Sequence, residues 1–224
     1  MENKYQLSLK ENIFLAKKTW VSQIYHMSKF ENCNTTLLQT EHILNYRADI
    51  SVSLNDAETI LNLRNGFRFM INHIQDELSL DFMKKINFLV AQNDSLDPGE
   101  IRRGQVGVSL YNGERYVPAI PKEADVIAKI TAILSDLQHS ETYRGLVFML
   151  EMMKDQIFWD GNKRTAILSA NAYFIQQGLG IIEIDDSYFD EFNLMLSAFY
   201  QDQNKREILV KFLYENCIQG IDFN

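Results

Sequence analysis

Two stretches of the chain, residues 146–153 and 166–175, are apolar almost all the way round a helix. A helix of that kind has no face suited to water, so both stretches belong at the centre of a globular fold. Only 10 glycines and 3 prolines occur among the 224 residues, below the average usage of roughly 7% and 5%. That shortage argues against a many-turned β-sandwich or barrel and predicts an all-α fold.

Apolar residues recur at helical spacing through nearly the whole sequence, and N-capping residues mark several starts. The second expected helix is capped by Thr35 or Thr36, and the third by Ser53 or Asn55. We expect an N-terminal helical extension over residues 1–50 and a core domain over residues 51–224, in one compact unit. The expected helices cover residues 10–30, the stretches after the two caps, and residues 80–92, 122–137, 141–158, 162–177, 187–202 and 204–216.

One stretch breaks the helical pattern. Val106, Val108 and Leu110 alternate with small residues, and Asn112-Gly113 precedes residues 115–117. This pattern predicts a β-hairpin, because Asn-Gly suits the tight turn that joins two short strands. A lone hairpin is marginally stable in water, so this one must pack against the helical body or pair its edge with another strand.

Charge and cysteine content limit the classes of partner. Thirty acidic against 22 basic side chains give a net charge of −8, which disfavours a nucleic-acid partner. No apolar run approaches the roughly 18 residues that cross a bilayer, so we expect no membrane partner. Cys33 and Cys217 lie far apart, and the first twenty residues carry six charges instead of an apolar leader. We therefore expect a cytoplasmic protein. The sequence leaves open whether the chain forms a homodimer.

A polar loop, residues 156–165, joins the two apolar stretches. Gly161 allows a tight turn, and the helix that follows would present unpaired N–H groups and a positive dipole end to an anion. Lys163 and Arg164 add positive charge, while Asp160 suits a hard cation such as Mg²⁺ riding on a phosphate. These residues predict a nucleotide phosphate site. The alternative is an aspartate N-cap on a buried helix with two cations that extend to solvent.

Residues 156–166, QIFWDGNKRTA, resemble the Fic/Doc signature HxFx(D/E)GN(G/K)R at nearly every position except the first. Residues 26–44 resemble the inhibitory-helix segment (S/T)xxxE(G/N) of Fic proteins, and residues 97–108 resemble the run that leads into their flap hairpin. The resemblance covers most of the chain. It implies the mostly helical Fic fold with a small hairpin flap, and an activity in which AMP passes from ATP to a protein hydroxyl. Doc-like members with the lysine variant of the motif transfer a phosphoryl group instead.

The resemblance also implies roles for individual residues. Asp160 would hold Mg²⁺, Gly161, Asn162 and Lys163 would bind the nucleotide, and Arg164 would contact its phosphates. Glu31 would be the inhibitory glutamate. An unknown target protein would dock by strand addition on the flap, whose residues include Val106, Gly107, Val108 and Tyr116.

Three residues depart from the family pattern. Gln156 stands where the family has its catalytic histidine, and a carboxamide cannot carry a proton away. We therefore expect weakened transfer with nucleotide binding kept, or an inactive ATP-binding pseudoenzyme that regulates a partner. Ile167 replaces a second arginine that pairs with the inhibitory glutamate in many members, which leaves autoinhibition by Glu31 open. Met27 replaces the serine or threonine of the inhibitory segment.

Several other polar residues remain without an assigned role. His42, His73 and His139 show no spacing that suggests a metal site or a triad, and His26 lies just before Glu31. The sequence leaves open whether Arg102 and Arg103 reach a phosphate or are simply solvated.

A purely structural interaction module ranks last among the function classes, because Asp160, Gly161, Asn162 and Arg164 are all intact.

Overall fold

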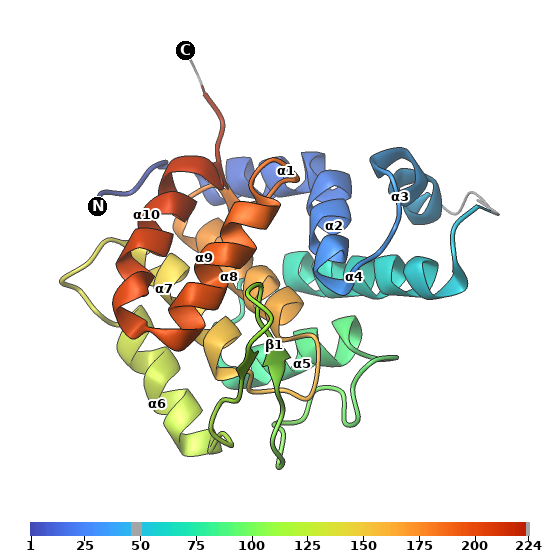
Figure 1. Ribbon diagram of the computed structural model, residues 1–224. Helices are drawn as coiled ribbons and strands as arrows, with labels where there is room; N and C mark the ends of the chain where they lie inside the picture. Colours follow the sequence, from blue (N-terminus) through green and yellow to red (C-terminus); the bar gives the residue numbers. More distant parts are fainter. Residues whose placement is uncertain (46–50, 223–224) are drawn as a thin grey trace.

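A computed structural model describes residues 1–45 and 51–222. Residues 46–50, at the end of the expected N-terminal extension, and residues 223–224 lie outside this description. The described part contains ten α-helices, two 3₁₀ turns and two short two-stranded ribbons. Figure 1 shows how the helices are arranged. The expected all-α class with a small hairpin is confirmed.

Helices α7 (Glu141–Asp155) and α8 (Asn162–Gln177) form the centre. They pack together along their length, and nearly all of their apolar side chains are fully buried. Gly145 permits this close packing, since a Cβ there would meet the Phe174 ring at 2.5 Å. On one side α8 packs against α4 (Leu54–Asn72) and α5 (Leu80–Val90). On the other side α7 packs against α6 (Glu123–Leu134), α9 (Phe189–Gln201) and α10 (Arg206–Asn216).

The N-terminal part contains α1 (Leu9–Lys18), α2 (Trp20–Ser28), the 3₁₀ turn η1 (Lys29–Glu31) and α3 (Leu37–Leu44). The single helix expected over residues 10–30 is wrong, because the chain leaves the α-helical region at Thr19. The Thr19 hydroxyl donates to Leu15 O at 3.0 Å, a local bond that competes with helix continuation. Thr36 caps α3 in a capping box with Gln39, and Ser53 caps α4. The caps are therefore Thr36 rather than Thr35, and Ser53 rather than Asn55.

The predicted hairpin is present. Strands β1 (Val108–Ser109) and β2 (Arg115–Tyr116) pair antiparallel, with Val108 opposite Tyr116. A second ribbon, β3 (Ile181–Ile182) with β4 (Ile218–Gln219), was not expected. Two-residue strands are too short to show an alternating pattern, so periodicity does not reveal them.

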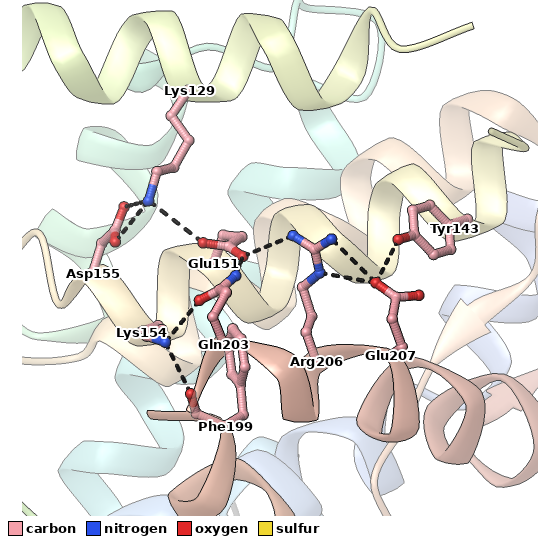
Figure 2. Close-up of polar contacts among 9 residues, drawn as sticks. All are labelled: Lys129, Tyr143, Glu151, Lys154, Asp155, Phe199, Gln203, Arg206 and Glu207. Atoms are coloured by element: carbon pink, nitrogen blue, oxygen red, sulfur yellow. Dashed lines mark hydrogen bonds and ion pairs between the residues drawn. The ribbon is translucent and has the colours of Figure 1, made fainter. Parts of the chain in front are cut away.

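A polar network fixes the outer face of α7 (Figure 2). Lys129 of α6 bonds Asp155 at 2.7 Å, and Arg206 of α10 bonds the buried Glu151 at 3.2 Å. Gln203 also donates to Glu151, at 2.5 Å. These bonds link α6 and α10 to the last turns of α7, directly before Gln156.

Among residues 1–45 and 51–222, no helix combines the length and the apolar character needed to cross a bilayer.

Candidate functional site

The loop between α7 and α8 bends through two left-handed residues. Gln156, with φ 47°, ends α7, so the expectation that this helix reaches Phe158 is wrong. Gly161, with φ 70°, precedes the first turn of α8, which begins at Asn162 as expected. Gly161 is also packed tightly, because a Cβ there would meet the Ala91 methyl at 2.8 Å. Only glycine satisfies both demands without strain.

Amide side chains hold this loop closed. Asn162 Oδ1 accepts from Phe158 N at 2.9 Å, and Asn162 Nδ2 donates to Phe158 O at 2.9 Å. Asn87 Nδ2 donates to Asp160 O at 2.8 Å and to Thr165 Oγ1 at 3.1 Å. Both amides are committed to protein partners, so Asn162 contributes to an anion site only through its backbone.

Within the described part of the chain, the first turn of α8 lacks a side-chain cap. Its N–H groups therefore form the kind of terminus that favours an anion. Asp160 Oδ1 accepts from Gly161 N at 2.5 Å, and the Asp160 side chain is 45% exposed.

The protein ligands at this loop suit one metal ion that is also bound by a phosphate. Among residues 1–45 and 51–222 no three acidic, histidine or cysteine side chains form a metal cage. Asp160 offers a single accessible carboxylate, and Mg²⁺ commonly binds through one or two carboxylates together with substrate phosphates.

Arg164 lies inside the protein and is fully buried. Its Nη1 donates to Val90 O at 2.6 Å, and its Nη2 lies 3.2 Å from Asp94 Oδ2 and 3.5 Å from Asp160 Oδ1. Its Nε lies 2.7 Å from Glu31 Oε1. The guanidinium that the sequence assigns to phosphate therefore already binds carboxylates of the chain itself.

Glu31 reaches Arg164 from η1, which ends at the left-handed Asn32 with φ 57°. Burial raises the pKa of the Glu31 carboxyl to about 7, with Arg164 opposing this shift and Asp160 and Asp94 adding to it. Lys163 lies close by, its ammonium 5.4 Å from the centre of the Phe30 ring. Burial lowers the pKa of Lys163, and Glu31 partly opposes that change.

A cavity of about 320 Å³ lies where the N-terminal segment, the hairpin and the motif meet. Phe30 and Asn32 line it from the N-terminal side, Val108 and Leu110 from the hairpin, and Lys163 from α8. Helix α9 completes the wall with Ser197 and Tyr200 among its residues. Segments separated by more than a hundred residues thus converge on one concave site, which is the usual form of a small-molecule pocket.

The hairpin rests on α9 beside this cavity. Tyr111 N donates to Ser197 Oγ at 3.0 Å, and the Tyr116 and Tyr200 rings lie 5.1 Å apart. Val108 and Tyr116 are paired strand residues, whereas Val106 and Gly107 precede the ladder. The hairpin therefore forms one wall of the cavity and rests on α9.

Gln156 is nearly buried, and its amide is fixed. Nε2 donates to Met153 O at 2.6 Å and lies 3.4 Å from the Tyr200 hydroxyl, which itself donates to Met153 O at 2.8 Å. Burial raises the pKa of Tyr200, so its phenol stays protonated. Neither side chain is a proton acceptor near neutral pH.

The chain is 25% identical over 171 residues to the protein adenylyltransferase Fic of Drosophila willistoni. That match covers 72% of the chain but 33% of the relative, so the chain spans about a third of the relative's length. No family model matches the chain.

Solved structures give the strongest similarity. A Fic-domain signalling protein from Bacteroides thetaiotaomicron superposes with a TM-score of 0.78 at 18% identity, covering 93% of this chain and 86% of that one. The chain has the Fic fold. Fic-1 from C. elegans gives 0.71 at 21% identity, covering 90% of this chain and 63% of its own. Together with the sequence match, these similarities confirm the resemblance to the Fic family.

The departures from the Fic pattern have structural counterparts. Ile167, at the position of the second Fic arginine, is 4% exposed and lies beside Met27 and Phe30 around a small closed cavity. Glu31 contacts the first motif arginine, Arg164, instead. His26 bonds Glu183 at 2.7 Å, while His73 and His139 each bond an aspartate three residues away; none of these three histidines lines the 320 Å³ cavity.

Asp94 and Tyr200 were not expected at this Fic-fold site, and the place of Arg102 was left open. Asp94 binds Arg164 from the loop after α5, Tyr200 holds the Gln156 amide, and Arg102 is buried beneath the hairpin. Asp94 and Tyr200 carry no local motif. Arg102 sits in the run 97–108 that resembles the approach to a Fic flap, and that position was its only signal.

Proposed function

We propose that the chain is a Fic-type nucleotide-binding protein that takes Mg-ATP at the start of α8. Its chemistry is related to transfer of AMP to a protein hydroxyl, with transfer weakened by Gln156. The named activity of the Drosophila relative, a protein adenylyltransferase, supports this assignment.

One observation carries the proposal: Glu31 Oε1 lies 2.7 Å from Arg164 Nε. A carboxylate from a distant segment is bound at the guanidinium of the phosphate motif, beside an uncapped helix start. A site that binds the chain's own anion is suited to an external one, because guanidinium and helix N–H groups favour carboxylate and phosphate alike. In this proposal Glu31 is inhibitory, since a phosphate oxygen must displace it to reach Arg164.

The remaining roles follow from position. Asp160 would hold Mg²⁺, which would neutralise phosphate charge. Backbone N–H groups of residues 161–163 would bind phosphate oxygens, and the N–H of Gly161 would first leave Asp160 Oδ1. Lys163 would add a positive charge within the cavity. The flap, including Val106, Gly107, Val108 and Tyr116, would dock an extended target segment by strand addition.

A second candidate is an inactive nucleotide-binding regulator. It is favoured by the fixed amide of Gln156, which bonds Met153 O and has no proton-accepting group beside it. In that case the chain would bind ATP and signal its occupancy to a partner through the flap.

Thermal melting with and without Mg-ATP tests the proposal. A ligand that binds the folded state raises Tm by mass action. We expect a larger rise for Glu31→Gly than for the unaltered chain, and little rise for Asp160→Ala. Glu41→Gly, an exposed change on α3, is the control for the loss of a glutamate. If Glu31→Gly melts at the same temperature with and without Mg-ATP, the nucleotide proposal is wrong.

A further inference from the structure

Arg102 is fully buried, although it stands in the exposed approach to the hairpin. Its side chain is therefore not solvated. Within residues 1–45 and 51–222, its guanidinium donates only to backbone carbonyls: Nε to Gln156 O at 2.5 Å, Nη1 to Gly104 O at 2.7 Å, and Nη2 to Ala119 O at 2.5 Å and Asp155 O at 3.4 Å.

These four carbonyls belong to two different structures. Gly104 and Ala119 stand at the two ends of the flap, before β1 and after β2. Asp155 and Gln156 are the last residue and the C-cap of α7, where helix carbonyls lack internal partners and the dipole is negative. A buried cation is favourable at that place, and the same cation joins both ends of the flap to the end of the helix.

The backbone around Arg102 runs beside the motif loop. Arg102 N donates to Ile157 O at 3.0 Å, and Ile101 forms an isolated bridge with Phe158. At Gly104 a Cβ would meet the Trp159 ring at 2.7 Å. Residues 101–104 therefore keep a fixed register against residues 157–159, and the flap leaves from that register.

We propose that Arg102 is a positioning residue that sets the flap relative to the motif loop. It thereby determines where a docked target hydroxyl lies relative to the nucleotide. A two-stranded ribbon is marginal alone, so its position depends on such anchors. Lysine cannot replace this arginine, because an ammonium lacks the planar fork that reaches several carbonyls at once. The role in transfer rests on the proposed function, whereas the anchoring of the flap does not.

The experiment compares Arg102→Lys and Arg102→Met with Arg103→Met. Arg103 is the neighbouring arginine, 84% exposed in its side chain and paired at the surface with Asp97. Three quantities are measured: hydrogen exchange of flap amides 104–119 against α8, the Kd for Mg-ATP, and self-labelling by radiolabelled ATP in a Gln156→His background.

For Arg102→Lys we expect flap exchange about tenfold faster, with unchanged exchange in α8, because the loss is local. We expect the Kd for Mg-ATP to stay within about threefold and labelling at saturating ATP to fall about tenfold, since misplacing the acceptor slows the transfer step. Arg103→Met should change none of these. If Arg102→Met fails to fold, the lysine variant still decides the result.

Two results would overturn the role of Arg102. One is flap exchange equal to that of Arg103→Met. The other is a uniform rise in exchange through α8 and the flap together, which indicates general destabilisation. If the Gln156→His parent binds Mg-ATP without labelling, the transfer part of the proposed function fails, and flap exchange alone decides whether Arg102 anchors the flap.

Discussion

A carboxamide at position 156 gives the motif a hydrogen-bonding group without a base. Met153 O is an acceptor only, so the Gln156 atom 2.6 Å away must be the donating Nε2. The amide is thus held in one orientation, and Tyr200 adds a second contact. Both contacts preserve the shape of the loop without providing a proton acceptor.

Restoring a histidine at this position should restore transfer. General-base catalysis is worth about 10²- to 10⁴-fold, so Gln156→His should raise labelling from radiolabelled ATP by a factor in that range. Gln156→Asn keeps a carboxamide and serves as the control. If the histidine variant binds Mg-ATP but labels no faster than the asparagine variant, the missing base is not what limits transfer.

Glu31 should make nucleotide binding depend on pH. In the docked state its pKa is raised to about 7, whereas a released, solvated carboxyl titrates near 4.5. Between pH 4.5 and pH 7, the state with Glu31 docked at Arg164 binds more protons than the state with Glu31 released. Protonation therefore stabilises the docked state fully below about pH 4.5, and this stabilisation is lost as the pH rises through 7. Release of Glu31 therefore becomes easier on the alkaline side.

We expect the affinity for Mg-ATP to rise about tenfold from pH 6 to pH 8, because a carboxyl whose pKa falls from about 7 to near 4.5 on release shifts the equilibrium by about that factor over this range. Isothermal titration calorimetry measures this directly. Glu31→Gln removes the titrating group and keeps the shape, so it corrects for protonation of ATP itself. If the affinity for Mg-ATP rises equally steeply with pH in the unaltered chain and in Glu31→Gln, the assigned role of Glu31 is contradicted.

At the scale of the element, the motif loop depends on Asn162. Its amide makes two buried hydrogen bonds with the backbone of Phe158. Asn162→Ala should lower the free energy of unfolding by about 2 kcal/mol or more, because it leaves buried backbone groups without partners. Urea denaturation measures the loss, and Asn204→Ala, at an exposed position, is the control. Equal stability of the two variants would show that the loop closes without this amide.

The elements that could be predicted are those with a local physical signal. Helix α8 begins and ends where its left-handed glycines, Gly161 and Gly178, dictate, and Asn112-Gly113 located the hairpin turn. The break at Thr19 was missed, because its hydroxyl bond to Leu15 does not alter the apolar period. The β3–β4 ribbon depends on pairing between residues some forty positions apart, which no local pattern encodes.

The same distinction applies to the site. Asp160, Gly161 and Arg164 were found because they are adjacent in sequence. Asp94 and Tyr200 were not, since each meets the motif only after the chain has folded. The resemblance to the Fic family located Glu31, yet its pairing with Arg164 was not foreseen, because in many members that glutamate pairs with a second arginine.

At the scale of the whole molecule, the N-terminal segment packs on the body through many contacts, and three of them lie close to η1. His26 bonds Glu183 at 2.7 Å, and the Tyr25 hydroxyl donates to Asp186 at 2.6 Å. The Phe30 ring lies 4.9 Å from the Phe189 ring. These contacts hold η1, and with it Glu31, against the motif.

Weakening this docking should open the site. Glu183→Gln removes the charged partner of His26, so we expect faster hydrogen exchange in residues 20–31 and an affinity for Mg-ATP several-fold higher, about 1 kcal/mol. Glu191→Gln removes an exposed negative charge at the start of α9 and is the control. Unchanged Mg-ATP affinity despite faster exchange would separate the docking contacts from inhibition.

The central claim is that the bend between α7 and α8 binds a triphosphate. A crystal structure of Glu31→Gly with Mg-ATP tests it most directly. We predict phosphate oxygens on the N–H groups of residues 161–163, a metal on Asp160, and Arg164 turned from protein carboxylates towards phosphate. A nucleotide bound elsewhere, with the first turn of α8 facing only protein or water, would contradict the account.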